Sequence, residues 1–196
     1  MITNRDNTIQ LLNNYNIKEF SNIKFQELPF VKKINLRGNP DNKYFISSFN
    51  KTLNATLPTD PNTYTSYGER KIIWLGPDEW LITDESQNNS DLLKKLHNAL
   101  GDLEHSITDV SENRTIIRIS GEKLFTLFSK FLVLDLENIF AKQSSVAQTL
   151  FIKVPILIVR IFKDYSYEPK FDIFVNRSHS NYIFNLLVDG TKNLDF

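Results

Sequence analysis

The sequence predicts an α+β fold made of two similar halves, each with the order strands, helix, strands, helix. The first observation is a shared layout. Residues 79–100 and residues 171–188 each hold an apolar strand, a polar capping residue and an amphipathic helix. The second observation is the composition: the 196 residues are 41% hydrophobic and 23% charged. This composition is ordinary for a chain that buries a core, and it argues against long disorder.

The chain divides into a polar arm and one domain. Residues 1–22 are rich in Asn and hold few apolar residues, so we expect a loose arm or a short helix there. Residues 23–196 are expected to form a single domain, because they contain no low-complexity segment and no linker longer than a loop. The two halves of this domain are expected to cover about 23–103 and 104–190.

Strands in the first half are predicted from the distribution of apolar residues, and helices from amphipathic spacing and capping residues. Asp41 is a candidate cap for the first helix, Ser90 is a candidate cap for the second, and Gly101 ends the second. The predicted strands cover 30–36, 71–75 and 79–83, a turn covers 57–62, and the helices cover 41–54 and 90–101. The expected inward faces of the two helices carry Tyr44, Phe45, Ile46, Phe49, Leu92, Leu93, Leu96 and Leu100.

The second half repeats this order. Gly121 is expected to open one helix, and Gly190 is expected to end the other. The predicted strands cover 105–110, 115–120, 146–154, 155–162 and 170–176, and the helices cover 121–131 and 178–188. The helical segments 124–132 and 182–188 are apolar around much of their circumference, whereas one apolar stripe suffices for a surface helix. Both a core between the halves and a permanent protein interface would explain this.

The residue types present exclude several classes of site. Cysteine is absent, which removes disulfides, thiolate nucleophiles, iron–sulfur clusters and zinc sites that use Cys. The three histidines, His97, His105 and His179, are not spaced as a helical metal-binding pair. The six glycines never form a G-x-G motif, which excludes the Rossmann and P-loop phosphate sites. We therefore expect neither a metal nor a cofactor on this chain.

Charge and hydropathy argue against nucleic-acid and membrane partners. Lys and Arg total 23, and Asp and Glu also total 23, so the chain has no basic excess that would attract phosphate backbones. The first residues form no apolar signal segment, and the most apolar stretch, residues 150–162, is charged in places and too short to span a bilayer. We expect a cytoplasmic protein.

Two adjacent carboxylates, Asp78 and Glu79, could serve as an acid–base pair. However, neighbouring residues of a strand point to opposite faces, so the two carboxylates would not share a substrate. A turn flanked by Trp74 and Trp80 is the favoured interpretation.

Four other polar residues and a histidine are candidates for catalytic or binding groups. Asp109 and Ser111 could be an orienting carboxylate and a nucleophile, but no histidine is near them in sequence and a turn at a strand end is favoured. His179 is expected to lie at a surface or to cap a helix. Arg114 or Arg118 could meet a carboxylate ligand, although a surface or intersubunit ion pair is favoured. No catalytic residue is therefore expected.

Several longer motifs resemble the gamma subunit of heterotetrameric sarcosine oxidase. The most specific is WLGPDEWLI, and the set extends over nearly the whole chain, from about residue 25 to 190. The motifs lie at 34–38, 57–58, 74–82, 109–121, 134–136, 147–149 and 171–178. The resemblance implies a fold similar to the folate-binding aminomethyltransferase of the glycine cleavage system.

The same resemblance implies the fold without the chemistry of that transferase. The essential carboxylate of the aminomethyltransferase lies in an Asp-Asp pair just before an apolar strand. Here the matching strand is 157–162, and the pair falls on Pro155 and Ile156, neither of which has a carboxylate. Proline can neither accept a proton nor hold an amine by charge.

The resemblance also implies partners. This chain would be a non-catalytic structural subunit without a cofactor of its own, and it would assemble with alpha, beta and delta subunits. Those subunits would carry FAD, FMN, NAD, the tetrahydrofolate site and zinc. The complex would oxidise sarcosine to glycine with tetrahydrofolate and oxygen, giving methylenetetrahydrofolate and hydrogen peroxide. The alternative hypothesis is a free-standing folate-binding protein related to aminomethyltransferase.

Overall fold

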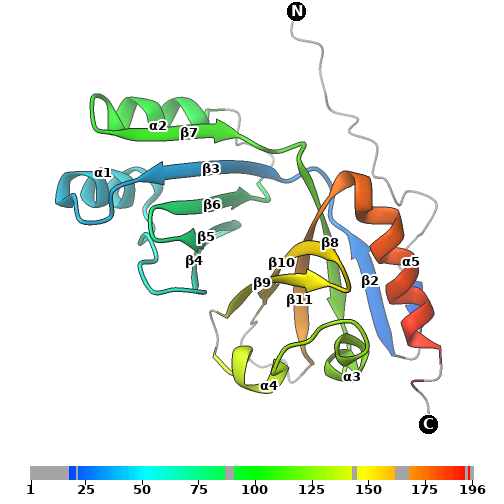
Figure 1. Cartoon of the computed structure of the whole chain (residues 1–196). Helices are drawn as coiled ribbons and strands as arrows, with labels where there is room; N and C mark the ends of the chain where they lie inside the picture. The colour runs from blue at the N-terminus through cyan, green and yellow to red at the C-terminus, as the bar shows by residue number, and fades with distance from the viewer. Residues whose placement is uncertain are drawn as a thin grey trace, which may run out of the picture.

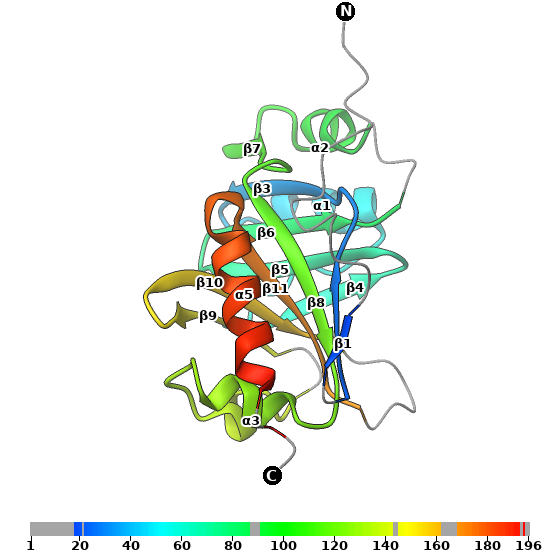
Figure 2. The ribbon, with the colours of Figure 1, turned by 90° about the vertical axis from the view of Figure 1, so that its right-hand side faces the viewer.

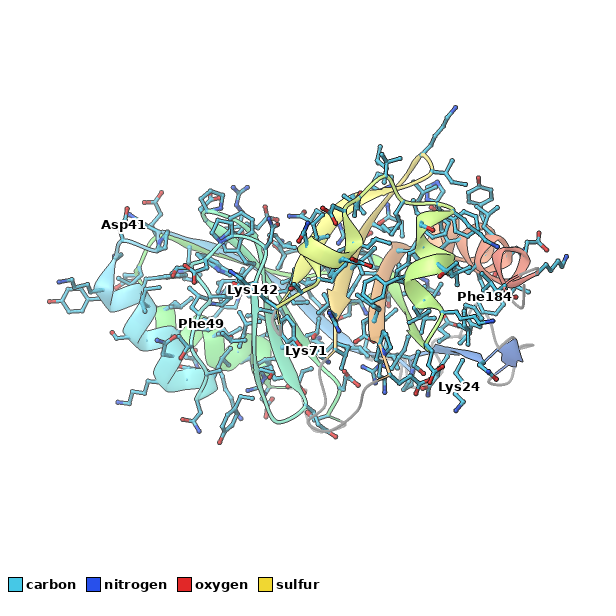
Figure 3. The ribbon with its side chains drawn as sticks, turned by 90° about the horizontal axis from the view of Figure 1, so that it is seen from below. Lys24, Asp41, Phe49, Lys71, Lys142 and Phe184 are labelled. Carbon is cyan, nitrogen blue, oxygen red and sulfur yellow. The ribbon has the colours of Figure 1, made fainter. Side chains whose placement is uncertain are left out.

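The computed structural model describes residues 18–20, 22–86, 91–142, 145–161, 168–192 and 194. In this part of the chain, two antiparallel sheets pack against each other, and helices cover the outer face of each sheet (Figure 1). The view from below in Figure 3 shows the layers side by side, with Phe49 in a helix at one end and Phe184 in a helix at the other. The α+β class is confirmed.

The five-stranded sheet has the strand order β4-β5-β6-β3-β7. Its strands are β4 (Tyr64–Tyr67), β5 (Arg70–Gly76), β6 (Glu79–Asp84), β3 (Lys32–Gly38) and β7 (His105–Asp109). Pro77 and Asp78 turn the chain between β5 and β6, as predicted. Strand β4 was not predicted, because its polar sequence YTSY leaves all four side chains at least partly exposed and shows no apolar alternation.

The six-stranded sheet has the order β1-β2-β8-β11-β10-β9. Its strands are β1 (Lys18–Phe20), β2 (Ile23–Glu27), β8 (Arg114–Ser120), β11 (Lys170–Asn176), β10 (Val154–Arg160) and β9 (Val146–Phe151). Strand β1 lies within the segment 1–22 that was expected to be a loose arm; residues 1–17 and 21 lie outside the described part. Strand β2 was also missed, although Ile23 and Phe25 are buried and alternate with exposed Lys24 and Gln26.

The helices of the first half, α1 (Lys43–Leu53) and α2 (Leu92–Leu100), cover the five-stranded sheet. Asn42, rather than Asp41, caps α1, and Tyr44, which was expected to face inward, is 77% exposed. Helix α2 ends at Gly101 as predicted, where φ is +51°. The predicted cap Ser90 lies outside the described residues, and Asp91 occupies the N-cap position.

The N-cap of α1 gives a direct test of this correction. The side-chain Oδ1 of Asn42 accepts from the backbone N of Tyr44 at 2.9 Å and of Phe45 at 3.3 Å. We expect Asn42→Ala to lower the free energy of unfolding by about 1 kcal/mol, because these two N–H groups lose their acceptor. The matched change Asp41→Ala should leave it nearly unchanged. Urea denaturation of both variants measures this, and equal losses would contradict the assignment of the cap.

The helices of the second half are α3 (Leu124–Ser129), α4 (Leu136–Ile139) and α5 (Ser180–Thr191). Helix α3 is shorter than predicted at both ends, and α4 was not predicted. Gly190 does not end α5, because that helix continues through it to Thr191. A Cβ on Gly190 would lie 2.6 Å from the ring of Phe131 and 2.7 Å from the side chain of Leu127, so this glycine permits close packing of α5 on the α3 region.

The sheets do not divide at residues 103 and 104, where the boundary between the halves was expected. Strand β2, from the first half, pairs with β8 in the six-stranded sheet, and β7, from the second half, pairs with β3 in the five-stranded sheet. The five-stranded sheet therefore contains β7 from the second half, and the six-stranded sheet contains β2 from the first half together with β1 from the segment before it (Figure 2).

Three clusters of buried side chains stabilise the layers. One lies between the five-stranded sheet and helices α1 and α2, and one between the six-stranded sheet and helices α3, α4 and α5. The third joins the inner faces of the two sheets, with Leu81 from one and Phe174 from the other among its members. Most apolar residues of α3 and α5 belong to the second cluster or pack against it. Packing in the core therefore explains why these helices are apolar around much of their circumference.

Candidate functional site

A network of buried charges crosses from one sheet to the other. Arg118 of β8 donates to both carboxylate oxygens of Asp172 on β11, at 2.7 Å from Nε and 2.9 Å from Nη2. The same Nη2 lies 3.0 Å from Oε1 of Glu85, which follows β6. Lys71 of β5 completes the network with 2.6 Å to Glu85 and 3.8 Å to Asp172. Two cations and two carboxylates therefore bridge the sheets without net charge, near the labelled Lys71 in Figure 3.

In this network, hydrogen bonds and ion pairs affect the pKa values of Glu85 and Arg118 more than burial does. Burial alone would raise the pKa of Glu85, but hydrogen bonds and charge from Lys71 and Arg118 hold this pKa below its usual value. Burial would lower the pKa of Arg118, but the bond to Asp172 raises it. Glu85 and Arg118 are thus both charged at neutral pH. Arg118 was expected to make a surface or intersubunit ion pair; it makes a partly buried pair within the chain instead.

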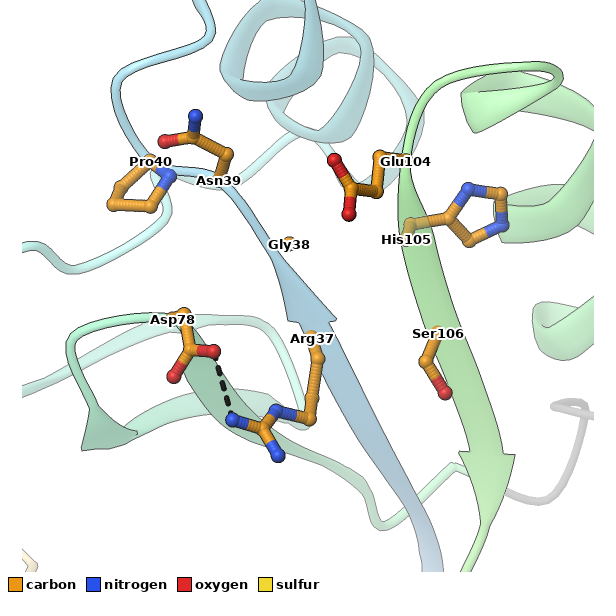
Figure 4. A pocket seen from close by; sticks show the side chains of 8 residues that line it. All are labelled: Arg37, Gly38, Asn39, Pro40, Asp78, Glu104, His105 and Ser106. Carbon is orange, nitrogen blue, oxygen red and sulfur yellow. Dashed lines mark hydrogen bonds and ion pairs between the residues drawn. The ribbon is translucent and has the colours of Figure 1, made fainter.

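Asp78 and Glu79 border two different cavities. Asp78 pairs with Arg37 at 2.7 Å at the mouth of a cavity of about 400 Å³, where both side chains are about half exposed (Figure 4). Glu79 lines a smaller cavity of about 170 Å³ and accepts from Nδ2 of Asn35 at 2.7 Å. The two carboxylates therefore line different cavities, in keeping with the opposite directions expected for neighbouring side chains.

Asp109 and Ser111 form a turn at the end of β7. The backbone N and the Oγ of Ser111 donate to Oδ1 of Asp109 at 3.0 and 2.5 Å, and the other Asp109 oxygen pairs with Lys32 at 2.6 Å. The Oγ of Ser111 also accepts from the backbone N of Lys33 at 3.0 Å. The hydroxyl thus connects β3 to the turn, and the predicted turn is confirmed.

His179 lies at the N-terminal end of α5, where it occupies the N-cap position without a side-chain capping bond. Its Nδ1 is 3.2 Å from Oγ of the neighbouring Ser178, and that serine is exposed. The position agrees with the expected place at a helix end.

The smaller cavity brings Arg114 and Lys33 together. It is lined by residues of β3, β6 and β8 and of the loop from β7 to β8, including Asn35, Glu79 and Asn113. Burial lowers the pKa of Arg114, and Glu79 partly offsets this. Within the described residues the Arg114 side chain makes no hydrogen bond or ion pair, so the surface ion pair expected for it is not formed there, and the intersubunit pair stays a prediction.

Lys33 is the most unusual titratable group beside this cavity. Its side chain is buried, with 3% exposed, and its Nζ donates to the backbone O of Val31 at 2.8 Å. Burial lowers its pKa to about 8 from the usual 10.5; Asp109 works against the shift and Arg177 adds to it. A pKa lowered in the folded state means that the unfolded chain binds more protons between about pH 8 and pH 10.5.

The free energy of unfolding should therefore rise with pH across this window. We expect Lys33→Met to remove this rise. Between pH 7 and pH 10, the free energy of unfolding of the native protein should therefore increase by about 2 kcal/mol more than that of the variant. Urea denaturation at both pH values measures the difference, and Lys95→Met on the exposed face of α2 is the control. If the free energy of unfolding rose no more with pH in the wild-type protein than in the variant, the lowered pKa of Lys33 would be contradicted.

The bridging charges were missed from the sequence, although a signal exists. Asp172 interrupts the apolar run of β11, and Arg118 interrupts that of β8, and the two residues are direct partners in the antiparallel register. Each charge alone is unremarkable, and only the pairing of the strands shows that they meet.

The described residues provide neither a cluster of metal ligands nor a helix that could span a membrane. The described residues contain no group of three or more His, Cys, Asp or Glu side chains that could hold a metal ion. Among the same residues, no helix is both long and apolar enough to cross a membrane.

Comparison with known proteins decides the family. The family model described as "Sarcosine oxidase, gamma subunit family" matches residues 37–193. The chain belongs to the sarcosine oxidase gamma subunit family. A gamma subunit from Corynebacterium sp. (strain P-1) is 26% identical over 140 residues, covering 70% of this chain and 67% of that protein. One from Corynebacterium sp. (strain U-96) is 30% identical over 89 residues, covering 45% and 42%.

Solved structures agree with this family in fold. A chain of the heterotetrameric sarcosine oxidase from Corynebacterium sp. U-96, in complex with pyrrole 2-carboxylate, matches with a TM-score of 0.78 at 22% identity, covering 89% of this chain and 86% of that chain. Aminomethyltransferase T of the glycine cleavage system from Bartonella henselae matches with a TM-score of 0.59 at 14% identity, covering 84% and 45%. The fold implied by the sequence motifs is confirmed.

Proposed function

We propose that this gamma-family chain is a non-catalytic, structural subunit of a cytoplasmic sarcosine oxidase complex. The family match over residues 37–193 carries the proposal. The disposition of the polar residues supports it. Asp109 and Ser111 hold a turn, Asp78 pairs with exposed Arg37, and Arg118 and Asp172 join the two sheets. These contacts stabilise turns and the junction of the sheets, which supports a structural role for the chain.

The proposed partners are alpha, beta and delta subunits, which would bring the flavins, NAD, zinc and the folate site to the complex. The test is affinity purification of the tagged chain from cells that express it naturally, followed by mass spectrometry and a visible spectrum. We expect other chains to elute with it and a flavin absorption band. A colourless single species would contradict a stable complex.

A second experiment separates a structural role from a dispensable one. The partner subunits are expressed with and without this chain, and their assembly and sarcosine-dependent hydrogen peroxide production are compared. We expect assembly or activity to fall when the chain is omitted. A remaining complex with full stability and activity would overturn the proposal.

Folate binding by the chain itself is the alternative function. The residues at the position of the transferase carboxylates do not fit it: Pro155 is exposed and pairs with Leu150 of β9, and Ile156 is 5% exposed in the core. Neither can hold a folate amine by charge. Calorimetric titration of the isolated chain with tetrahydrofolate tests this alternative, and tight binding would favour it.

A further inference from the structure

The cavity beside Arg114 has more cationic than anionic groups around it. Arg114 and Lys33 line it, and Arg177 lies close enough to affect the charge of Lys33. Glu79 is the carboxylate in the lining, and one of its oxygens is already bonded to Asn35. The nearby Asp109 is bonded by Lys32 and Ser111. With two cations and one carboxylate, the lining of the cavity carries a net positive charge.

The hydrogen-bond donors of these cations are also largely unused. Arg114 presents five N–H donors and has no hydrogen bond within the described residues. Lys33 has three donors, and its Nζ makes one hydrogen bond there, to the backbone O of Val31. Asn113, which also lines the cavity, makes no side-chain hydrogen bond in the described part. A cavity where unused donors from Arg114, Lys33 and Asn113 gather has the chemistry that an anion requires.

The size and walls of the cavity restrict the anion. Its volume of about 170 Å³ is close to the roughly 150 Å³ cavity known to hold benzene, so it admits a molecule of only a few non-hydrogen atoms. Leu81 and Val110 provide apolar wall. The negative charge of Glu79 opposes a dianion such as phosphate, whereas a planar guanidinium matches a carboxylate with two parallel hydrogen bonds.

We propose that this cavity binds a small organic monocarboxylate. Its carboxylate is held by Arg114 with Lys33 and Asn113 beside it, and its apolar part lies against Leu81 and Val110. The site would sit where the loop after β7 carries the chain from the five-stranded sheet to β8 of the six-stranded sheet (Figure 1). The described lining residues come from this chain, so binding can be tested on the chain by itself.

The test uses the full-length chain and isobutyrate as the probe. Titration is followed by ligand-observed saturation-transfer NMR and by calorimetry. For six non-hydrogen atoms we expect a dissociation constant on the order of 1 mM. Isobutyramide, which has the same shape without the charge, and inorganic phosphate should both bind at least about tenfold more weakly, as the loss of one charge-assisted contact predicts.

Two variants locate the site. Arg114→Met should weaken isobutyrate binding at least about tenfold, because it removes the guanidinium. Arg114→Lys keeps the charge but not the planar pair of donors, so it should give an intermediate affinity. Circular dichroism of both variants checks that the fold is kept. Lys95→Met on the exposed face of α2 removes a charge elsewhere and should bind as the native chain does. Absence of binding, equal binding of isobutyramide or phosphate, or unchanged affinity in Arg114→Met would each overturn the proposal.

Discussion

Replacing Asp172 by Asn should lower the free energy of unfolding by about 3 kcal/mol. The Asp172 side chain is 2% exposed, and both of its oxygens accept from Arg118. The amide retains one acceptor but loses the charge, which leaves Arg118 partly buried with only Glu85 to compensate it. Urea denaturation monitored by circular dichroism measures the loss.

Two comparison variants make this prediction specific. Asp189→Asn breaks an ion pair with Lys192 whose side chains are 64% and 72% exposed, and it should cost less than about 0.5 kcal/mol. The double change Arg118→Met and Asp172→Leu removes both charges and should recover more than half of the loss. If Asp172→Asn cost no more than Asp189→Asn, the network would not stabilise the junction of the sheets.

Replacing Phe171 by Ala should lower the free energy of unfolding by about 4 kcal/mol, the largest effect we expect from a single substitution. Phe171 is fully buried in β11, and three aromatic rings pack edge-on against it. These are Phe125 at 5.8 Å, Phe128 at 5.2 Å and Phe140 at 5.0 Å between ring centroids. The truncation leaves a void among side chains that come from both α3 and α4, and it removes three favourable ring contacts.

The control for this variant is Phe30→Ala, because Phe30 is 50% exposed and precedes β3. Its loss should be under about 1 kcal/mol. A shift of the thermal midpoint that is similar for the two variants would contradict the role of Phe171 at the centre of this aromatic cluster.

The apolar alternation of the sequence was sufficient for most of the fold. The strands 71–75, 79–83, 115–120 and 170–176 were predicted within one residue of their bounds, because each pairs with neighbours on both sides and is apolar enough to show it. Helix ends were predicted wrongly where neighbouring residues offered competing capping or termination signals. Asp41 and Asn42 are both good caps, and Gly190 resembles a helix end until the packing of Phe131 on it is known.

The site was less accessible to sequence reasoning. The turn at Asp109 and Ser111 is local, so residue types alone predicted it. Contacts of Arg118 with Glu85 and Asp172 join residues that are 33 and 54 positions apart. The cavity of Lys33 and Arg114 depends on two strands of different sheets. Such groupings follow from topology, which residue spacing does not encode.

The exchange of β2 and β7 between the sheets has a consequence for synthesis on the ribosome. Strand β2 emerges early, but its partner β8 is made only after every strand of the five-stranded sheet, β7 included. Until then Ile23 and Phe25, which are buried in the finished protein, have no sheet to join. The nascent chain therefore carries an apolar strand without its partner β8 for about half of translation, a stage at which chaperones protect such segments from aggregation.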